Sequence, residues 1–223
     1  MNITKELLER DPSLQQHLEG KWNVPFDGSV GYTSFNDAGL ECETGEFLYA
    51  MVRILQPQNV LETGTHHGVG ASYIGSALRD NKKGRLDTIE FNAENYHIAK
   101  ERMQTLGLEE YVTQHLMDAR NFRATDDHYD IILLDTEPEL RFGELIRYMP
   151  SLAEGGYVFI HDLHRHMHQI PNEEHGFAWP YGKLPEQIVQ WVNDGILRPF
   201  HFPTPRGLTG FYKVKAEDYQ WQK

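Results

Sequence analysis

A glycine-rich turn that follows a short apolar segment is the feature that most constrains the fold of this chain. Residues 60–72 read Val-Leu-Glu-Thr-Gly-Thr-His-His-Gly-Val-Gly-Ala-Ser. This order predicts a strand that ends in an acidic residue, then a glycine turn and the first residues of a helix. Glycine lets backbone amides approach a ligand closely, and the helix N-terminus adds the positive end of its dipole. The segment therefore predicts a strand–turn–helix unit with a ligand at the turn.

The glycine spacing distinguishes between classes of cofactor. A dinucleotide-binding fold uses G-x-G-x-x-G, which needs a glycine at the position of His66. An NAD-dependent oxidoreductase is therefore the weakest hypothesis for this chain. His66 and His67 lie inside the turn, where they either contact a ligand or are exposed to solvent.

Strand-like and helix-like segments alternate along the chain, which predicts a parallel sheet with helices on both faces. Residues 131–134, Ile-Ile-Leu-Leu, are typical of a strand that is buried on both faces. The predicted fold class is α/β, a Rossmann-like, doubly wound, seven-stranded sheet that is mostly parallel with a C-terminal antiparallel strand. Strands are expected at 59–62, 85–90, 111–117, 129–135 and 157–161, and a closing antiparallel pair near 196–202 and 208–214. Helices are expected at 44–55, from 69, and at 93–106, 139–149 and 185–194.

The N-terminal region and one later turn carry separate expectations. Residues 3–19 show a helical pattern that is broken at Asp11-Pro12, and 20–41 form a polar, glycine-rich loop. Gly107 is expected to cap the helix at 93–106. Gly155-Gly156 is expected to turn the chain into the fifth strand.

Composition limits the class of partner. The chain has 223 residues, enough for one domain with a substantial core, and its 21 basic and 33 acidic residues give a formal net charge of −12. An acidic surface repels phosphate backbones, so no nucleic-acid partner is expected. The single cysteine, Cys42, fits a reducing compartment, and no apolar run is long enough to span a bilayer. We expect a cytoplasmic protein with no membrane partner.

Glu90 is the first candidate for a contact with a nucleoside. It ends the second predicted strand, about twenty residues after the last glycine of the turn, which is the spacing of a ribose-binding acid. A carboxylate there can accept hydrogen bonds from both ribose hydroxyls. The alternative is a solvated acid at a strand end.

Short motifs give the chain a resemblance to a known family. They lie in order along the chain, at 44–48 (TGEFL), 61–65 (LETGT), 88–92 (TIEFN), 133–136 (LLDT), 155–156 (GG), 160–162 (IHD) and 207–212 (GLTGFY). Together they resemble class I S-adenosylmethionine-dependent methyltransferases, closest to the catechol-O-methyltransferase-like group and its small-molecule relatives. The resemblance implies an N-terminal helical and loop extension over 1–43 and a methyltransferase domain over 44–223, within a single domain overall.

The resemblance implies S-adenosylmethionine as cofactor and a small molecule as methyl acceptor, with transfer to oxygen. By analogy with the group, it also allows a homodimer. In this superfamily Asp118, with the backbone amide of Ala119, commonly binds the adenine edge, and its alternative role is to cap the turn at 119–122. The cofactor-binding residues implied are Glu62, Gly64, Thr65, Gly68, Ser72, Glu90, Phe91, Asp118, Ala119 and Asp135.

A divalent metal is a further implication of the resemblance. In the group, the acid that ends strand four and an Asp-Asn pair that ends strand five bind Mg²⁺. Asp135 and Asp162 match two of these positions, but Leu163 replaces the asparagine. A set of Asp135, His161 and Asp162 suits Mn²⁺, Fe²⁺ or Zn²⁺ better than Mg²⁺. Alternatively, Asp135 caps the turn after strand four and Asp162 organises its own loop.

The catalytic base implied by the resemblance is also altered. The group's lysine, three residues beyond the strand-four acid, is replaced by Pro138. Histidine is the natural base at neutral pH, and residues 161–168 contain four histidines. His161 is the first candidate and His164 the second, with Asp135 as a further catalytic residue that orients the acceptor. Three aromatic residues and a proline of the loop at 171–183 (Phe177, Trp179, Tyr181 and Pro180), together with Trp22 and Phe26, are candidates for a substrate lid. The alternative is a packed surface loop or a subunit contact.

Other functions stay open on the sequence. The missing lysine allows an N-methyltransferase, which needs less base. Relatives in antibiotic tailoring suggest a metal-dependent hydroxylase, in which His161 and Asp162 would bind iron. A non-catalytic S-adenosylmethionine-binding protein is the third hypothesis.

Overall fold

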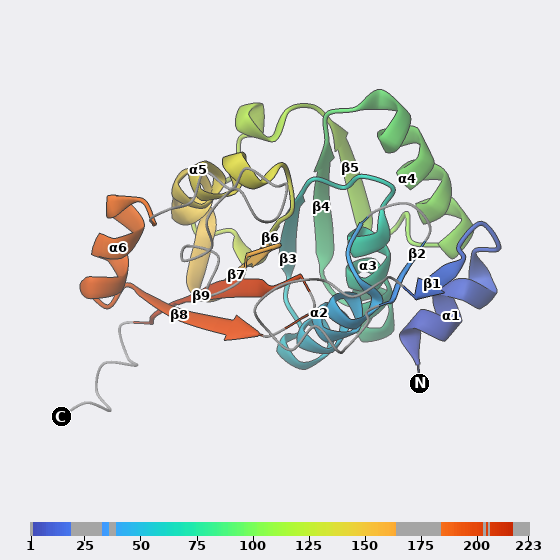
Figure 1. Ribbon diagram of the computed structural model, residues 1–223, viewed down its shortest axis with the longest axis horizontal. Coiled ribbons are helices and arrows are strands. Elements are labelled where there is room, and N and C mark those ends of the chain that lie inside the picture. The colour runs from blue at the N-terminus through green and yellow to red at the C-terminus, as the bar shows by residue number, and fades with distance from the viewer. Residues whose placement is uncertain are drawn as a thin grey trace.

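The computed structural model describes residues 2–18, 33–35, 39–163, 184–202, 204 and 206–215. Its centre is a sheet with the spatial order β5-β4-β3-β6-β7-β9-β8 (Figure 1). The first five strands in this order are parallel, and β9 pairs antiparallel with both β7 and β8. The strands are β3 (Asn59–Thr63), β4 (Arg85–Glu90), β5 (Val112–Leu116), β6 (Tyr129–Leu134), β7 (Leu152–His161), β8 (Leu197–Phe202) and β9 (Leu208–Lys213). The predicted fold class is confirmed.

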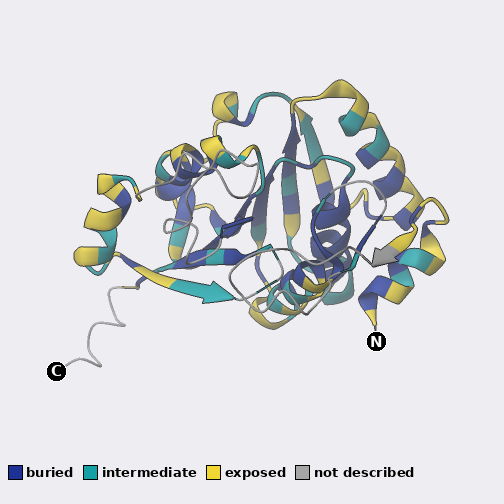
Figure 2. Cartoon of the chain, in the orientation of Figure 1, coloured by how far each residue is buried: buried dark blue, intermediate teal, exposed yellow. Residues whose placement is uncertain are grey.

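Helices cover both faces of the sheet. Successive residues of a strand point to opposite faces, so Val60 packs with the helices of one face and Leu61 with those of the other. The central strands are consequently buried on both sides (Figure 2). The first face carries α1 (Ile3–Arg10), α2 (Cys42–Leu55), α3 (Val69–Asn81) and α4 (Ala93–Leu106), and the second α5 (Pro138–Tyr148) and α6 (Glu186–Asn193).

Two local predictions were wrong. Residues 16–18 form a strand, β1 (Gln16–Leu18), which pairs antiparallel with β2 (Thr33–Phe35) inside the range expected to be a loop. Gly155 and Gly156 lie within β7 instead of before it, because β7 begins at Leu152. Gly155 has φ +78°, and the register with β6 shifts nearby, between Tyr129 and Ile131. Glycine in a strand here permits a bulge.

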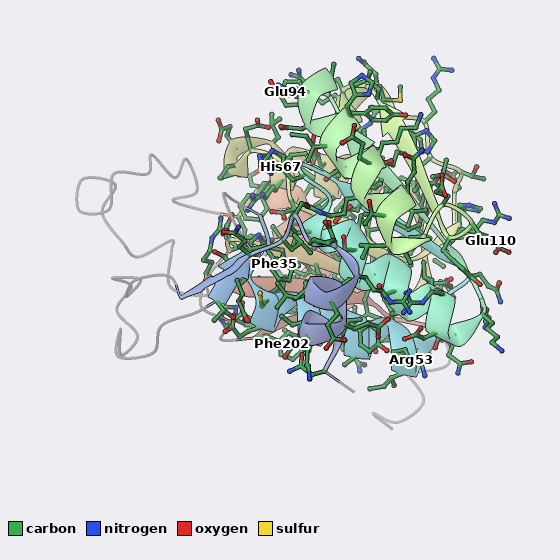
Figure 3. All side chains as sticks on the ribbon, turned by 90° about the vertical axis from the view of Figure 1, so that its right-hand side faces the viewer. Phe35, Arg53, His67, Glu94, Glu110 and Phe202 are labelled. Atoms are coloured by element: carbon green, nitrogen blue, oxygen red, sulfur yellow. The ribbon has the colours of Figure 1, made fainter. Side chains whose placement is uncertain are left out.

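Residues before α2 share the core with the sheet. Ile3, Leu7 and Leu14 are buried in the same cluster as α2 and α3. Arg102 of α4 forms a buried ion pair with Asp11 at 2.9 Å and also donates to the backbone carbonyl of His67. Figure 3 looks onto this side of the molecule, with α1 and α4 toward the viewer. The N-terminal segment is thereby linked to the glycine turn.

The order of the strands determines where a ligand can bind. β3 and β6 are neighbours, but the chain continues from β3 to β4 on one side and from β6 to β7 on the other. In open α/β sheets the ligand crevice lies beyond the carboxyl ends of the strands at such a switch point. No helix in the described ranges is long and apolar enough to cross a membrane.

Alanine substitutions at two glycines with positive φ distinguish the cost of backbone strain from the cost of a steric clash. Gly84 (φ +84°) lies before β4, and a Cβ there would lie 2.2 Å from the backbone oxygen of Pro57. Gly107 (φ +67°) caps α4 as predicted, and a Cβ there meets nothing within 4 Å. Gly107→Ala should lower the free energy of unfolding by about 1–2 kcal/mol through left-handed strain alone.

Gly84→Ala should cost the same strain plus roughly 1–3 kcal/mol for displacing the backbone at Pro57. Urea denaturation of both variants measures the difference. Equal losses would show that the chain before β4 is not packed as described.

Candidate functional site

A cleft of about 620 Å³ lies at the carboxyl ends of β3, β4, β6 and β7. Its volume is in the range of pockets that bind cofactors and drug-sized ligands. Many of the predicted site residues line it. The lining includes Gly64, His66, Glu90, Phe91, Asp118, Ala119, Asp135, Arg141, His161, Asp162 and Arg206.

Gly64, at the start of the turn, lies close to the backbone of Asp135. Its φ is +85°, and a Cβ there would lie 2.3 Å from the backbone oxygen of Asp135. The turn after β3 therefore packs directly against the end of β6, which only glycine permits. Gly68 caps α3 with φ +80°, so the helix N-terminus begins just behind the turn.

Glu62 supports the turn from behind. The Thr88 hydroxyl donates to Glu62 Oε2 at 2.5 Å, and a Cβ on Gly70 would lie 2.2 Å from Glu62 Oε1. Burial, with the charges of Asp135 and Glu90, raises the pKa of Glu62 to about 8, although the Thr88 hydrogen bond opposes the shift. Glu62 is not among the residues that line the cleft.

Three other implied cofactor residues also shape the turn without lining the cleft, namely Thr65, Gly68 and Ser72. Thr65 bonds Thr88 through their hydroxyls at 2.5 Å, and the Ser72 hydroxyl donates to the carbonyl of Gly68 at 2.6 Å. These residues hold the loop and the first turn of α3. Their direct contact with a cofactor stays a prediction.

Glu90 is buried at the end of β4 and faces the cleft. The backbone amide of His66 donates to its Oε2 at 2.7 Å, and the amide of Asn92 donates to its Oε1 at 2.8 Å. The carboxylate is thereby held between the glycine turn and the start of α4. Each carboxylate oxygen can accept further hydrogen bonds, so ribose hydroxyls can still be bound.

Asp118 has the capping geometry that was the alternative to adenine binding. It accepts from the backbone amide of Arg120 at 2.8 Å and forms an ion pair with the Arg120 guanidinium at 2.5 Å. These hydrogen bonds hold the pKa of Asp118 below its usual range. Asp118 and Ala119 still line the cleft, as does Phe91, which is 64% exposed. Phe91 offers an apolar surface to a flat ligand.

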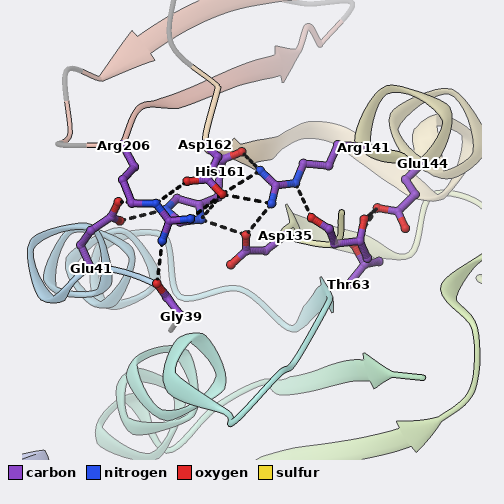
Figure 4. Close-up of polar contacts among 10 residues, drawn as sticks. Gly39, Glu41, Thr63, Asp135, Arg141, Glu144, His161, Asp162 and Arg206 are labelled. Carbon is purple, nitrogen blue, oxygen red and sulfur yellow. Dashed lines mark hydrogen bonds and ion pairs between the residues drawn. The ribbon is translucent and has the colours of Figure 1, made fainter. Parts of the chain in front are cut away.

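His161 lies at the centre of a buried charge cluster (Figure 4). Its Nδ1 is 2.8 Å from Asp135 Oδ1, and its Nε2 is 2.8 Å from Glu41 Oε2. Burial opposes the charged ring, but the carboxylates of Asp135, Asp162 and Glu41 outweigh burial and raise the pKa of His161 to about 10. The raised pKa and the carboxylate oxygen 2.8 Å from each ring nitrogen both favour an imidazolium that donates from both nitrogens.

Two arginines complete the cluster. Arg141 of α5 bonds Asp135 Oδ1 and Asp162 Oδ2, each at 3.2 Å, and donates to the backbone carbonyl of His161. Arg206, between β8 and β9, donates from Nη2 to Asp162 Oδ2 at 2.8 Å, and its Nε forms an ion pair with Asp162 Oδ1 at 2.6 Å. Burial disfavours the Asp162 carboxylate, but His161, Arg206 and Arg141 hold its pKa below the usual range.

The residues as arranged do not fit a divalent ion. Ligand atoms of Glu41, His161 and Asp162 lie within 4.8 Å of one another. This group contains Glu41 in place of Asp135, which was predicted as the third metal ligand. His161, however, has no free nitrogen lone pair, because both ring nitrogens bond carboxylates. A histidine ligand must be neutral to bind a metal.

The structure brings together most of the predicted residues and adds three. Glu41, Arg141 and Arg206 were missed because none lies in a recognised motif. The only signal was charge next to a motif, since Glu41 precedes the 44–48 segment and Arg206 precedes 207–212. His164, the lid residues at 177–181, Trp22 and Phe26 lie outside the described residues.

The protonation state of His161 can be measured directly. Because its folded pKa is raised to about 10, nitrogen-15 NMR should show both ring nitrogens protonated at about pH 8, where an ordinary histidine is neutral. Its contribution to stability should be complete below about pH 6.5 and be lost as the pH rises toward 10. A neutral tautomer at pH 7 would contradict the assigned hydrogen bonds.

Residues 61–163 match a family model described as a methyltransferase domain. A relative from Mycobacterium sp. (strain KMS), provisionally named an O-methyltransferase, is 27% identical over 121 residues, which cover 52% of this chain and 54% of the relative. A similar relative from Mycolicibacterium smegmatis is 28% identical over 121 residues, covering 52% of this chain and 56% of the relative. The chain spans about half the length of the curated relatives that it matches.

Solved structures share the fold over a larger part of the chain. The S-adenosylhomocysteine-bound methyltransferase PaMTH1 of Podospora anserina has a TM-score of 0.67 and 16% identity, covering 96% of this chain and 88% of its own. The O-methyltransferase TomG of Streptomyces achromogenes, in complex with S-adenosylmethionine, has a TM-score of 0.60 and 18% identity, covering 81% of this chain and 83% of its own. These structures confirm the predicted fold, and the match over 61–163 together with the mycobacterial relatives confirms the predicted resemblance of the chain to class I S-adenosylmethionine-dependent methyltransferases.

Proposed function

We propose that this protein is an S-adenosylmethionine-dependent O-methyltransferase that acts on a small molecule. The observation that carries the proposal is the position of Glu90, a buried carboxylate held by two backbone amides beside the glycine turn and open to the cleft. The methyltransferase-domain match over 61–163 supports it. So do the O-methyltransferase names of the relatives and the cofactors bound in the structural neighbours.

The cofactor half of the cleft fits S-adenosylmethionine. Glu90 would accept hydrogen bonds from the ribose, and Phe91 would pack against the adenine ring, next to Ala119. Gly64 allows the cofactor to approach the backbone, which a Cβ would prevent. When bound, the cofactor supplies a sulfonium-activated methyl group, so the chain needs mainly to position the acceptor.

The acceptor half is formed by the ends of β6 and β7. Asp135 Oδ1 is engaged by His161 and Arg141, whereas its Oδ2 has no hydrogen bond within the described part of the chain. We assign this oxygen to orienting the acceptor hydroxyl. His161 is a poor base in this arrangement, because both of its nitrogens already donate. His164 stays a predicted base, outside the described residues.

Replacing Glu90 tests the cofactor site. Glu90→Ala should weaken S-adenosylmethionine binding in isothermal titration roughly 10- to 150-fold, because a hydrogen bond to a charged group contributes about 1.5–3 kcal/mol. Glu94→Ala is the matched control, since it removes the same charge from an exposed position on α4 that does not line the cleft. Unchanged affinity in a folded Glu90→Ala variant would place the cofactor elsewhere.

An acceptor screen tests the reaction. Incubation with S-adenosylmethionine and a panel of catechols, phenols and sugars should yield S-adenosylhomocysteine in an acceptor-dependent way. Asp135→Asn should reduce the turnover roughly tenfold or more while changing the cofactor affinity little, because an orienting group acts in the transition state.

Tight cofactor binding without methylation of any acceptor would instead support a non-catalytic binding protein. Turnover that requires oxygen and bound iron would support the hydroxylase hypothesis. Either result would contradict the proposed transfer to oxygen.

A further inference from the structure

The charge cluster contains as many cationic as anionic side chains. Glu41, Asp135 and Asp162 provide three carboxylates, and His161, Arg141 and Arg206 provide three basic groups. The side chains of Glu41 and His161 are 0% and 1% exposed. Buried carboxylates are unfavourable unless opposite charges compensate them, so each of these cations stabilises the buried carboxylates.

Arg206 contacts the acidic residues from the solvent side. Its Nε lies 2.6 Å from Asp162 Oδ1 and 3.5 Å from Glu41 Oε1, and its Nη2 lies 2.8 Å from Asp162 Oδ2. Its Nη1 donates to the backbone carbonyl of Gly39 at 2.9 Å. One guanidinium thus connects oxygen ligands from the segment before α2 and from the end of β7 (Figure 4).

These oxygens are the ones that a divalent ion would use. Ligand atoms of Glu41, His161 and Asp162 lie within 4.8 Å of one another, but carboxylates engage both nitrogens of His161, so an ion here would be held by the carboxylates of Glu41 and Asp162. The guanidinium already pairs with both carboxylates, since it donates to Asp162 Oδ2 and lies within ion-pair distance of Asp162 Oδ1 and Glu41 Oε1. An ion at this position would have to displace the Arg206 guanidinium from the carboxylates of Glu41 and Asp162.

We propose that Arg206 takes the place of a divalent cation in this protein. Its guanidinium neutralises the carboxylates of Glu41 and Asp162 by ion pairing, and an ion can reach their oxygens only when Arg206 is removed. This inference concerns the charge cluster alone and does not depend on the proposed methyl transfer.

Mn²⁺ is the probe for the test, with binding to EDTA-treated protein measured by electron paramagnetic resonance and by the shift in melting temperature. The wild-type protein should bind no Mn²⁺ at the cluster. Arg206→Ala should bind one Mn²⁺ in the micromolar range, and the ion should raise its melting temperature. Arg206→Lys keeps the charge and should exclude Mn²⁺ as the wild type does.

Arg120→Ala is the matched control, because it removes a cleft arginine from an ion pair with Asp118 outside the cluster. It should gain no Mn²⁺. Stoichiometric binding by the wild-type protein would overturn the proposal, as would the absence of binding in folded Arg206→Ala. If Arg206→Ala does not fold, Arg206→Gln provides the same neutral comparison.

Discussion

The buried hydrogen bonds of His161 connect the parts of the chain that form the cleft. His161 ends β7, and its ring bonds Asp135 at the end of β6 and Glu41 at the start of α2, which is 120 residues away in sequence. Removing one partner from a buried ionic network costs about 3–5 kcal/mol, because the remaining charge has no compensation. Loss of one partner of this network should therefore destabilise the end of the sheet.

The cleft has two chemically different halves. Beyond β3 and β4, the glycine turn, the carboxylate of Glu90 and the exposed Phe91 form the part of the cleft to which we assign the nucleoside. Beyond β6 and β7, the His161 cluster forms a charged wall that presents Asp135. Gly64 joins the halves, since it brings the turn after β3 against the backbone of Asp135. This contact explains how a donor and an acceptor would meet at one point.

Much of the fold could be predicted from sequence because strand and helix periodicities alternate regularly from residue 44 onward. The strand at Arg85–Glu90 and the helix at Ala93–Leu106 have the expected bounds. The β1–β2 pair was missed because three-residue strands have too few residues for a visible alternation. Gly155 was assigned to a turn, since a bulge inside a strand uses the same residue type.

The site was predictable only where a motif ends a strand. Glu90, Asp135 and His161 line the cleft as their strand-end positions imply, whereas Glu62 turns behind the glycine loop. Its direction depends on the packing of Gly70 and Thr88, which the sequence pattern does not contain. Glu41 and Arg206 approach the cluster from segments distant in sequence, so only tertiary structure reveals them.

The measurement that tests the account most directly is a crystal structure of the protein with S-adenosylhomocysteine. We predict the ligand in the cleft, with its ribose hydroxyls within hydrogen-bond distance of Glu90 and its sulfur facing Asp135. A ligand bound outside the cleft, or with its ribose away from Glu90, would contradict the assignment of the site.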